Sequence, residues 1–265
     1  MFLCLDTATS RTTVAMVSGA GELLAESAVD HSDPGEVALT QIDSALDIAN
    51  VAKSDLAAVV VGVGPGPYTS TRVGCVVAQT IGFTLGIPTV GACTHDAIAL
   101  QVVDGRAHAL AHGDDWDPHG AFIVATDARR KEIYWAAYDE HGSRVRGPEV
   151  AKPDAVVELA RDLFGETPAV AGDGFARYPD FADLGQIRLV GPKHPSAHWL
   201  ANVIGIDNVL TAELHSGALV DHESNGQDLV DLQARAFAPY PLYLREPDAK
   251  PAAQPTVEYE GRPQQ

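Results

Sequence analysis

One stretch, Val59 to Gly74, constrains the fold of this chain more than any other. Its sequence is VVVGVGPGPYTSTRVG. The apolar run ends in a loop of glycine and proline, so the stretch predicts a buried strand, a tight loop and the start of a helix. The backbone N–H groups of such a loop often bind an anion. The loop is therefore either the phosphate cradle of an enzyme or a rigid turn that sets a helix for a partner.

The helix predicted over residues 69–86 carries no charge after Arg72, and from Val73 to His95 the chain contains no Asp, Glu, Lys or Arg. Residues four apart share one face of a helix. Here a row of large residues runs beside a row of small ones: Val73, Val77, Ile81 and Leu85, and Gly74, Ala78, Gly82 and Gly86. A helix that is apolar all round is buried all round.

Two explanations fit this helix. Both rows belong to the internal core, with a helix over residues 34–50 covering the second face, or the two helices form a subunit interface. A glycine inside a helix costs about 1 kcal/mol relative to alanine and needs a packing reason, which favours the interface. The residues predicted there are Leu39, Ile42, Leu46, Arg72, Gly74, Val77, Ala78, Ile81, Gly82 and Leu85.

The rest of the chain alternates strands and helices in two units. The first unit is predicted to hold strands over 2–6, 12–17, 23–29, 56–62 and 88–91 and helices over 34–50, 69–86 and 94–103. The second is predicted to hold strands over 121–126, 132–138, 169–171 and 187–190, a helix over 155–164 and a broken helical stretch over 196–214.

This order predicts an α/β fold of two related halves, the second too short to repeat the first in full. We expect an N-terminal lobe over 1–103 and a smaller C-terminal lobe over 120–245. Between them, the polar insertion over 104–119 is expected to be a surface loop. The proline-rich tail over 246–265 is expected to be disordered.

Charge and cysteine content limit the partners and the compartment. Among 265 residues, 36 are acidic and 18 are Lys or Arg, a formal net charge of −18. Such a surface repels phosphate backbones, so strong nucleic-acid binding by the chain alone is not expected. Cys4, Cys75 and Cys93 lie in apolar stretches and form no C-x-x-C pair. Buried, reduced thiols in a cytoplasmic protein without a membrane span are therefore expected.

Four segments together resemble a known family. They are LDTATS at 5–10, GPGPYTSTRVG at 64–74, DARRKEIY at 127–134 and PLYLR at 241–245. In this order they resemble the TsaB (YeaZ) family, bacterial subunits for threonylcarbamoyladenosine modification of tRNA. The resemblance covers about residues 1–245, and its specific part is the Gly-Pro-Gly loop with its Thr and Arg.

The resemblance implies an actin-like ATPase fold, of the ASKHA or ribonuclease H-like class, with two lobes of which the second is shortened. It implies a non-catalytic subunit that docks through helices of its first lobe on TsaD, the related transferase. TsaE joins the complex, and the chain alone forms a homodimer. Any ATP or ADP binds at the surface shared with TsaD, and no other cofactor is implied.

This chain departs from the family loop, which reads Gly-Pro-Gly-Ser-Phe-Thr-Gly-Leu-Arg. It carries Pro67, Tyr68, Ser70 and Thr71 instead of the family's Ser, Phe, Gly and Leu. These replacements remove a hydroxyl at position 67 and backbone freedom at position 70.

Carboxylates for Mg²⁺ and glycine loops for phosphates are what an actin-like ATPase needs. Asp6 and Asp127 follow the strands that open the two halves, and Gly172-Asp173-Gly174 is the later glycine pair. The nucleotide-binding residues predicted on this basis are Asp6, Thr7, Gly64, Gly66, Asp127 and Arg129. A weak ATPase or kinase-like enzyme using Asp6 and Asp127 is therefore the alternative function. Both aspartates equally suit the capping of a turn, and the loop at 64–66 lacks the lysine of a P-loop.

Neither a metal site nor a catalytic residue is predicted. TsaD carries a helical His-x-x-x-His pair, but the matching stretch here keeps only His95, with alanine at position 99, and one imidazole is not a metal site. No Gly-x-Ser-x-Gly occurs, and Cys93 with His95 is the one Cys–His pair close in sequence.

The densest basic cluster of this acidic chain is Arg129-Arg130-Lys131. Arginine binds phosphate through paired, charge-assisted hydrogen bonds. The cluster therefore either contacts a phosphate of a nucleotide or tRNA, or forms a solvated hairpin turn.

Overall fold

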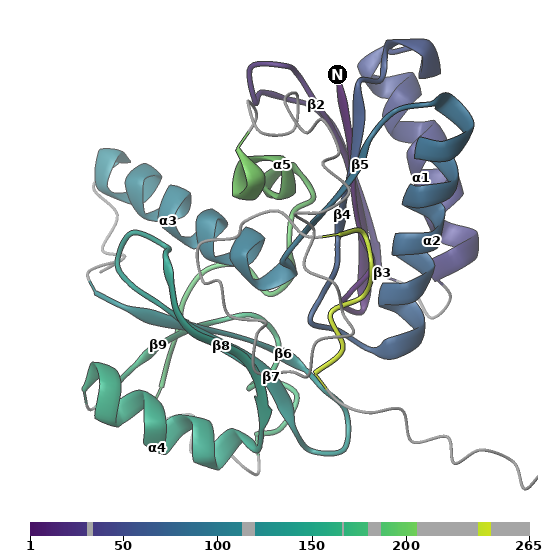
Figure 1. Ribbon diagram of the computed structural model, residues 1–265. Coiled ribbons are helices and arrows are strands. Elements are labelled where there is room, and N and C mark those ends of the chain that lie inside the picture. Colours follow the sequence, from purple (N-terminus) through teal and green to yellow (C-terminus); the bar gives the residue numbers. More distant parts are fainter. Residues whose placement is uncertain (31–33, 113–119, 166, 180–186, 206–237, 245–265) are drawn as a thin grey trace, which may run out of the picture.

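The computed structural model describes residues 1–30, 34–112, 120–165, 167–179, 187–205 and 238–244, with the side chains of 106–112 left aside. Two lobes, each built on one five-stranded sheet, lie side by side (Figure 1). The tail expected to be disordered, residues 246–265, lies outside the described residues.

The first lobe is built on a mixed sheet with the strand order β3-β2-β1-β4-β5. β1, β2 and β3 pair antiparallel, whereas β1, β4 and β5 pair parallel. The central strands are apolar on both faces, as a sheet covered by helices on both sides requires. The strands are β1 (Phe2–Asp6), β2 (Arg11–Val17), β3 (Leu23–Asp30), β4 (Ala58–Gly62) and β5 (Thr89–Ala92).

The second lobe repeats this sheet in full. Its order, β10-β9-β6-β7-β8, matches the first sheet strand for strand, with the same antiparallel and parallel pairs. The strands are β6 (Phe122–Asp127), β7 (Ile133–Tyr138), β8 (Arg144–Ala151), β9 (Ala169–Ala171) and β10 (Arg188–Leu189). The second half keeps the strand order of the first, but its strands β9 and β10 are shorter than β4 and β5.

Strand β8 was not predicted from the sequence. Its polar residues and its Gly147-Pro148 pair are untypical of a strand interior. The structure places β8 at the edge of the sheet, beside β7 alone, where a proline removes no ladder hydrogen bond from a second neighbour.

Helices cover both faces of the first sheet. α1 (Pro34–Ala49) and α2 (Tyr68–Leu85) pack on one face, beside a short 3-10 turn (Lys53–Asp55), and α5 (His198–Ile204) packs on the other (Figure 1). α3 (Thr94–His112) lies between the two sheets, and α4 (Pro153–Phe164) covers the far face of the second sheet. Among the described helices none is long and apolar enough to span a membrane.

Two predicted boundaries need correction. Residues 104–112, expected in a surface loop, continue helix α3, and the remaining insertion residues, 113–119, lie outside the described part. The first lobe also extends beyond residue 103. α5 packs on its sheet, and Leu242 of the segment 238–244 lies in the core beneath α1 and α2. Chain order alone does not show which sheet a late segment covers.

The small row of α2 packs inside the subunit. A Cβ on Gly74 would stand 2.3 Å from Oγ1 of Thr7, and one on Gly82 would stand 2.0 Å from Oγ1 of Thr89. The row thus allows the helix to approach its own sheet, which is the packing reason that its glycines require. Gly86, at φ 67°, ends the helix in the left-handed conformation.

The interface expectation is corrected accordingly. Ile42, Leu46, Gly74, Ala78 and Gly82 are buried within the chain and have no surface to offer a partner. The half-buried members of the predicted set, Val77, Ile81 and Leu85, pack at the edge of the same core. Leu39 and Arg72 are exposed. Any interface of α1 and α2 therefore uses their outer face.

Candidate functional site

Asp6 ends strand β1, and its carboxylate is fully buried. Oδ1 accepts the backbone N–H of Ala8 at 2.8 Å, and Oδ2 accepts the hydroxyl of Thr94 at 2.7 Å. A Cβ on Gly62 would stand 1.9 Å from Oδ2, so the glycine leaves room for this carboxylate. Burial raises the pKa of Asp6 to about 6. The residue holds the turn after β1 and is not accessible to a ligand.

The predicted phosphate loop packs against the same turn. A Cβ on Gly66 would stand 2.3 Å from the carbonyl oxygen of Ala8. The N–H of Gly64 donates to Oγ1 of Thr94 at 3.2 Å, and the N–H of Thr94 donates back to the carbonyl of Gly64 at 2.8 Å. Gly66 is therefore needed for close packing between backbone segments, and Gly64 for its φ of 99°.

The first turn of α2 is fixed by hydroxyl groups. Thr7 donates to the carbonyl of Ser70 at 2.6 Å. The carbonyl of Pro67 accepts the hydroxyls of Ser70 at 3.2 Å and Thr71 at 3.0 Å. Ser70 and Thr71, which replace the family's Gly and Leu, thus add hydrogen bonds that those residues could not make.

The segment 238–244 covers the start of α2 from outside. The N–H of Leu242 donates to the carbonyl of Val63 at 2.7 Å. The ring of Tyr243 stacks on that of Tyr68, with centroids 4.7 Å apart. Of the two interpretations of the Gly-Pro loop, this packing supports the rigid turn.

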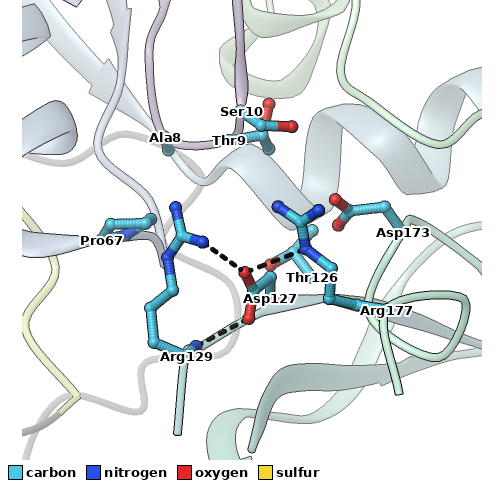
Figure 2. A pocket seen from close by; sticks show the side chains of 9 residues that line it. All are labelled: Ala8, Thr9, Ser10, Pro67, Thr126, Asp127, Arg129, Asp173 and Arg177. Carbon is cyan, nitrogen blue, oxygen red and sulfur yellow. Dashed lines mark hydrogen bonds and ion pairs between the residues drawn. The ribbon is translucent and has the colours of Figure 1, made fainter. Parts of the chain in front are cut away.

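Asp127 occupies in the second lobe the place that Asp6 occupies in the first, at the end of the strand that opens the sheet. Its Oδ1 accepts the N–H of Arg129 at 2.7 Å and the hydroxyl of Tyr178 at 2.6 Å. Its Oδ2 lies 3.2 Å from the guanidinium of Arg129 and 3.4 Å from that of Arg177. Figure 2 shows the carboxylate held between these two arginines.

The turn after β9 brings Arg177 and Asp173 to this place. A Cβ on Gly172, which has φ 92°, would stand 1.9 Å from the carbonyl oxygen of Ala125, and one on Gly174 would stand 2.9 Å from the carbonyl carbon. The later glycine pair thus lies directly on the backbone of β6. Arg177 was missed from the sequence because no local pattern connects it with Asp127, 50 residues earlier.

The β6–β7 turn has an unusual backbone. Arg129, Arg130 and Lys131 are all left-handed, with φ of 60°, 56° and 61°. Each non-glycine residue in this conformation costs on the order of 1–2 kcal/mol. The turn closes through the N–H of Ala128, which donates to the carbonyl of Glu132 at 3.1 Å, and the N–H of Glu132, which donates to that of Arg129 at 3.0 Å.

Together these residues line a small pocket between the lobes (Figure 2). Its volume is about 240 Å³, including space open to solvent. The first lobe contributes Ala8, Thr9, Ser10 and Pro67, and the second contributes Thr126, Asp127, Arg129, Asp173 and Arg177. Of the predicted nucleotide residues, only Asp127 and Arg129 line this pocket.

The pocket does not fit Mg²⁺-nucleotide chemistry. One predicted carboxylate, Asp6, is buried behind the turn, and the other, Asp127, is already paired with the guanidiniums of Arg129 and Arg177. Both aspartates accept the N–H of the residue two positions on, as the turn-capping alternative predicts.

The first turn of α3 connects the two lobes. Thr94 contacts the first, as described above. His95 lies 2.8 Å from Oγ1 of Thr126 through its Nε2, and Asp96 accepts the hydroxyl of Tyr138 at 2.7 Å and lies 3.2 Å from Nε of Arg144. Burial lowers the pKa of His95 to about 3, so the ring is neutral at physiological pH. Among the residues that the structure describes, no group of three or more metal-ligating side chains gathers here or elsewhere.

The three cysteines are free and buried. Burial raises the pKa of Cys4, Cys75 and Cys93 to about 12, so none is a thiolate at neutral pH. His95 is neutral and directed at Thr126, so Cys93 is not activated by it.

Comparison with known proteins identifies the family. The model for TsaD, described as tRNA N6-adenosine threonylcarbamoyltransferase, matches residues 30–201. A protein of Escherichia coli K12 named tRNA threonylcarbamoyladenosine biosynthesis protein TsaB is 30% identical over 186 residues, which cover 67% of this chain and 73% of that protein. The chain belongs to the TsaB (YeaZ) family.

Other relatives extend the match over nearly the whole chain. An uncharacterised protein of Mycobacterium tuberculosis H37Rv is 34% identical over 257 residues, covering 95% of this TsaB-family chain and 94% of the relative. A solved structure from Pseudomonas aeruginosa, of a protein with similarity to peptidase YeaZ, superimposes with a TM-score of 0.61 at 23% identity, over 92% of this chain and 99% of that one. The predicted α/β fold with two lobes is thereby confirmed, and it is the fold of this YeaZ-like protein.

Proposed function

We propose that this TsaB-family chain serves tRNA threonylcarbamoyladenosine biosynthesis as a non-catalytic subunit that docks on TsaD. The link to this process comes from the TsaB relatives, which are named for tRNA threonylcarbamoyladenosine biosynthesis. The observation that carries the docking role is the outer face of α1 and α2. Here Phe83 is 91% exposed, although it lies in a helix without a charged residue after Arg72.

Val76, seven residues before Phe83, lies on the same side of α2, and two large apolar side chains of α1 are also exposed. Val76 of α2 is 54% exposed, and on α1 Leu39 is 55% and Ile48 64% exposed. The two helices lie side by side on one face of the first sheet (Figure 1). Large apolar side chains that gather on one exposed side of a helix, as Val76 and Phe83 do, favour a protein interface there. We name Val76 and Phe83, together with the exposed side of α1 beside them, the α1–α2 docking face.

The non-catalytic part of the proposal rests on the two aspartates. Asp6 is inaccessible, and Asp127 is held by Arg129 and Arg177. These contacts speak against the alternative of an ATPase or kinase-like enzyme. Any ATP or ADP then binds where the docking face meets TsaD, and TsaE joins that complex. The free chain forms a homodimer through the same face, so TsaD competes with a second copy.

The docking test uses the double variant Val76→Asp/Phe83→Asp and TsaD from the same organism. Both side chains are exposed, so the fold is expected to survive while a buried charge at the interface abolishes the complex in sedimentation and tRNA modification with it. Leu163→Asp on α4, 47% exposed in the unmodified chain, is the matched control and is expected to change neither. An intact complex in the double variant would falsify docking through this face.

The catalytic alternative is tested by Asp127→Asn in the same complex. We expect ATP turnover and tRNA modification within about twofold of the unmodified chain, since the carboxylate is already paired with two arginines. Loss of modification with complex formation intact would instead identify Asp127 as a catalytic group.

A further inference from the structure

The β6–β7 turn is the one basic cluster of the sequence that the docking role does not use. Arg129, Arg130 and Lys131 are consecutive and exposed, in a chain whose formal net charge is −18. Long-range repulsion therefore opposes any polyanion that approaches this protein, and the turn is a place where that repulsion is locally reversed.

The backbone of the turn suggests that its charge has a purpose. Glycine adopts a left-handed conformation freely, and asparagine or aspartate adopts it more readily than a long side chain. The chain instead places three cations at left-handed positions, with φ between 56° and 61°. The shape of the turn does not require long cationic side chains at these positions. A surface that presents positive charge does require them.

The contacts of the turn fix its direction. Arg129 is anchored on Asp127 through both its backbone N–H and its guanidinium, which places it at the mouth of the pocket between the lobes (Figure 2). Arg177 reaches the same carboxylate from the other side. Arg130 and Lys131 follow at the exposed end of a hairpin whose strands are entirely buried.

Composition separates two kinds of anionic partner. Protein interfaces have an apolar centre, whereas contacts to a nucleic-acid backbone are made by charged and hydrogen-bonding groups. The exposed residues of this turn are all cationic, and the one apolar residue beside them, Ala128, is buried. This favours a phosphate backbone over an acidic protein.

We infer that Arg130 and Lys131, on the turn anchored by Arg129, bind backbone phosphates of the RNA substrate when the chain is docked on TsaD. The inference rests on the proposed function, which supplies the RNA. It adds a substrate-binding contact to a subunit whose own charge opposes RNA. The isolated chain is therefore expected to bind RNA far more weakly than the complex.

The experiment measures binding of unmodified tRNA to the complex of this chain with TsaD, by fluorescence anisotropy over a series of KCl concentrations. The test variant is Arg130→Gln/Lys131→Gln, which leaves the Arg129–Asp127 contact intact. The matched control is Lys53→Gln/Arg146→Gln, which removes two exposed positive charges elsewhere. Both variants therefore have the same net charge, so only the position of the lost charges differs.

We expect the test variant to bind tRNA roughly tenfold more weakly at physiological salt and its log–log salt slope to be less steep by about 2, because each lost phosphate contact lowers the slope by about 1. The control is expected to stay within about twofold with an unchanged slope. Equal affinity and slope in the two variants would overturn the inference. A test variant that binds TsaD more weakly, but whose remaining complex binds tRNA with unchanged affinity, would also overturn the inference. The turn would then contact TsaD rather than RNA.

A second variant, Arg130→Gly/Lys131→Gly, guards against a folding artefact. Glycine relieves the left-handed strain, so the melting temperature is not expected to fall, while tRNA affinity should fall as in the glutamine variant. Unchanged affinity contradicts the inference. The proposed function is judged separately, by whether the unmodified chain binds TsaD and supports modification at all.

Discussion

Asp6 and Asp127 stand at equivalent places in the two lobes, and their surroundings differ. Each ends the first strand of its sheet and accepts the N–H of the residue two positions on. Asp6 is then covered by Thr94 and by the closely packed Gly62. Asp127 opens on the pocket and meets two arginines. The two turns thus share their backbone hydrogen bond, while the carboxylate of one is enclosed in the core and that of the other pairs with two half-exposed arginines at a pocket.

The strongest test of this equivalence concerns the glycines after β4 and β9. In Gly66→Ala the new Cβ would stand 2.3 Å from a backbone carbonyl oxygen, and in Gly172→Ala it would stand 1.9 Å from one. We expect each to lower the free energy of unfolding by more than about 3 kcal/mol in urea denaturation. Gly19→Ala, with nothing within 4 Å, is the control and should change it by less than about 0.5 kcal/mol. A small effect at either site would mean that this lobe's turn is not packed on its strand.

The aspartates themselves should differ in what their loss costs. Asp6→Ala leaves two buried donors without an acceptor, so we expect a loss of about 3 kcal/mol in unfolding free energy. Asp127→Ala leaves arginines that can turn to water, so about 1 kcal/mol is expected. Urea titrations of both variants measure the difference, and equal losses would contradict the contrast between the lobes.

Protonation of Asp6 gives a pH signature. Its folded-state pKa, raised by burial to about 6 from 3.8, lies above the unfolded value, so folding favours the protonated form. The stabilisation that comes from protonating Asp6 is fully present below about pH 4 and is lost as the pH rises through about 6. Relative to Asp6→Asn, the unmodified chain should therefore lose about 2–3 kcal/mol between pH 4 and pH 7. Unfolding measured at several pH values tests this, and a constant difference between the two proteins would refute it.

The smallest effect on stability is expected for the ion pairs of Asp127 with Arg129 and Arg177. The side chains of Arg129 and Arg177 are 61% and 47% exposed, so solvent screens their attraction to Asp127. Double-mutant cycles of Arg129→Gln or Arg177→Gln with Asp127→Asn should give coupling energies of about 0.5–1 kcal/mol that shrink at high salt. Couplings well above this range, or independent of salt, would show that Asp127 is as enclosed as Asp6.

Much of the architecture could be predicted because strands and helices of this chain have strong local periodicity. The strands around Asp6 and Asp127 and the helices α1, α2 and α4 were found within a few residues. Strand β8 was missed because an edge strand tolerates Gly147-Pro148, and the end of α3 was missed because polarity alone does not end a helix.

The candidate site was less predictable. Periodicity shows that Gly74, Ala78 and Gly82 share a face, but not whether that face meets its own sheet or another subunit. The burial of these three residues and the Cβ contacts of the two glycines show that the face meets its own sheet. Asp127 and Arg129 were found through their motif, whereas the contact of Arg177 with Asp127 depends on how the turn after β9 lies on β6, which no sequence pattern encodes.

The segment 238–244 has a consequence for synthesis of the protein. Leu242 donates to the carbonyl of Val63, just after β4, and Tyr243 stacks on the first residue of α2, so a segment made late in synthesis completes a lobe that begins near residue 2. During translation the first lobe remains unfinished until this segment leaves the ribosome. A chain terminated early would lack the cover of Tyr68, and so would present α2 with an unsupported first turn. The first turn of α2 thus depends on a segment made more than 150 residues later.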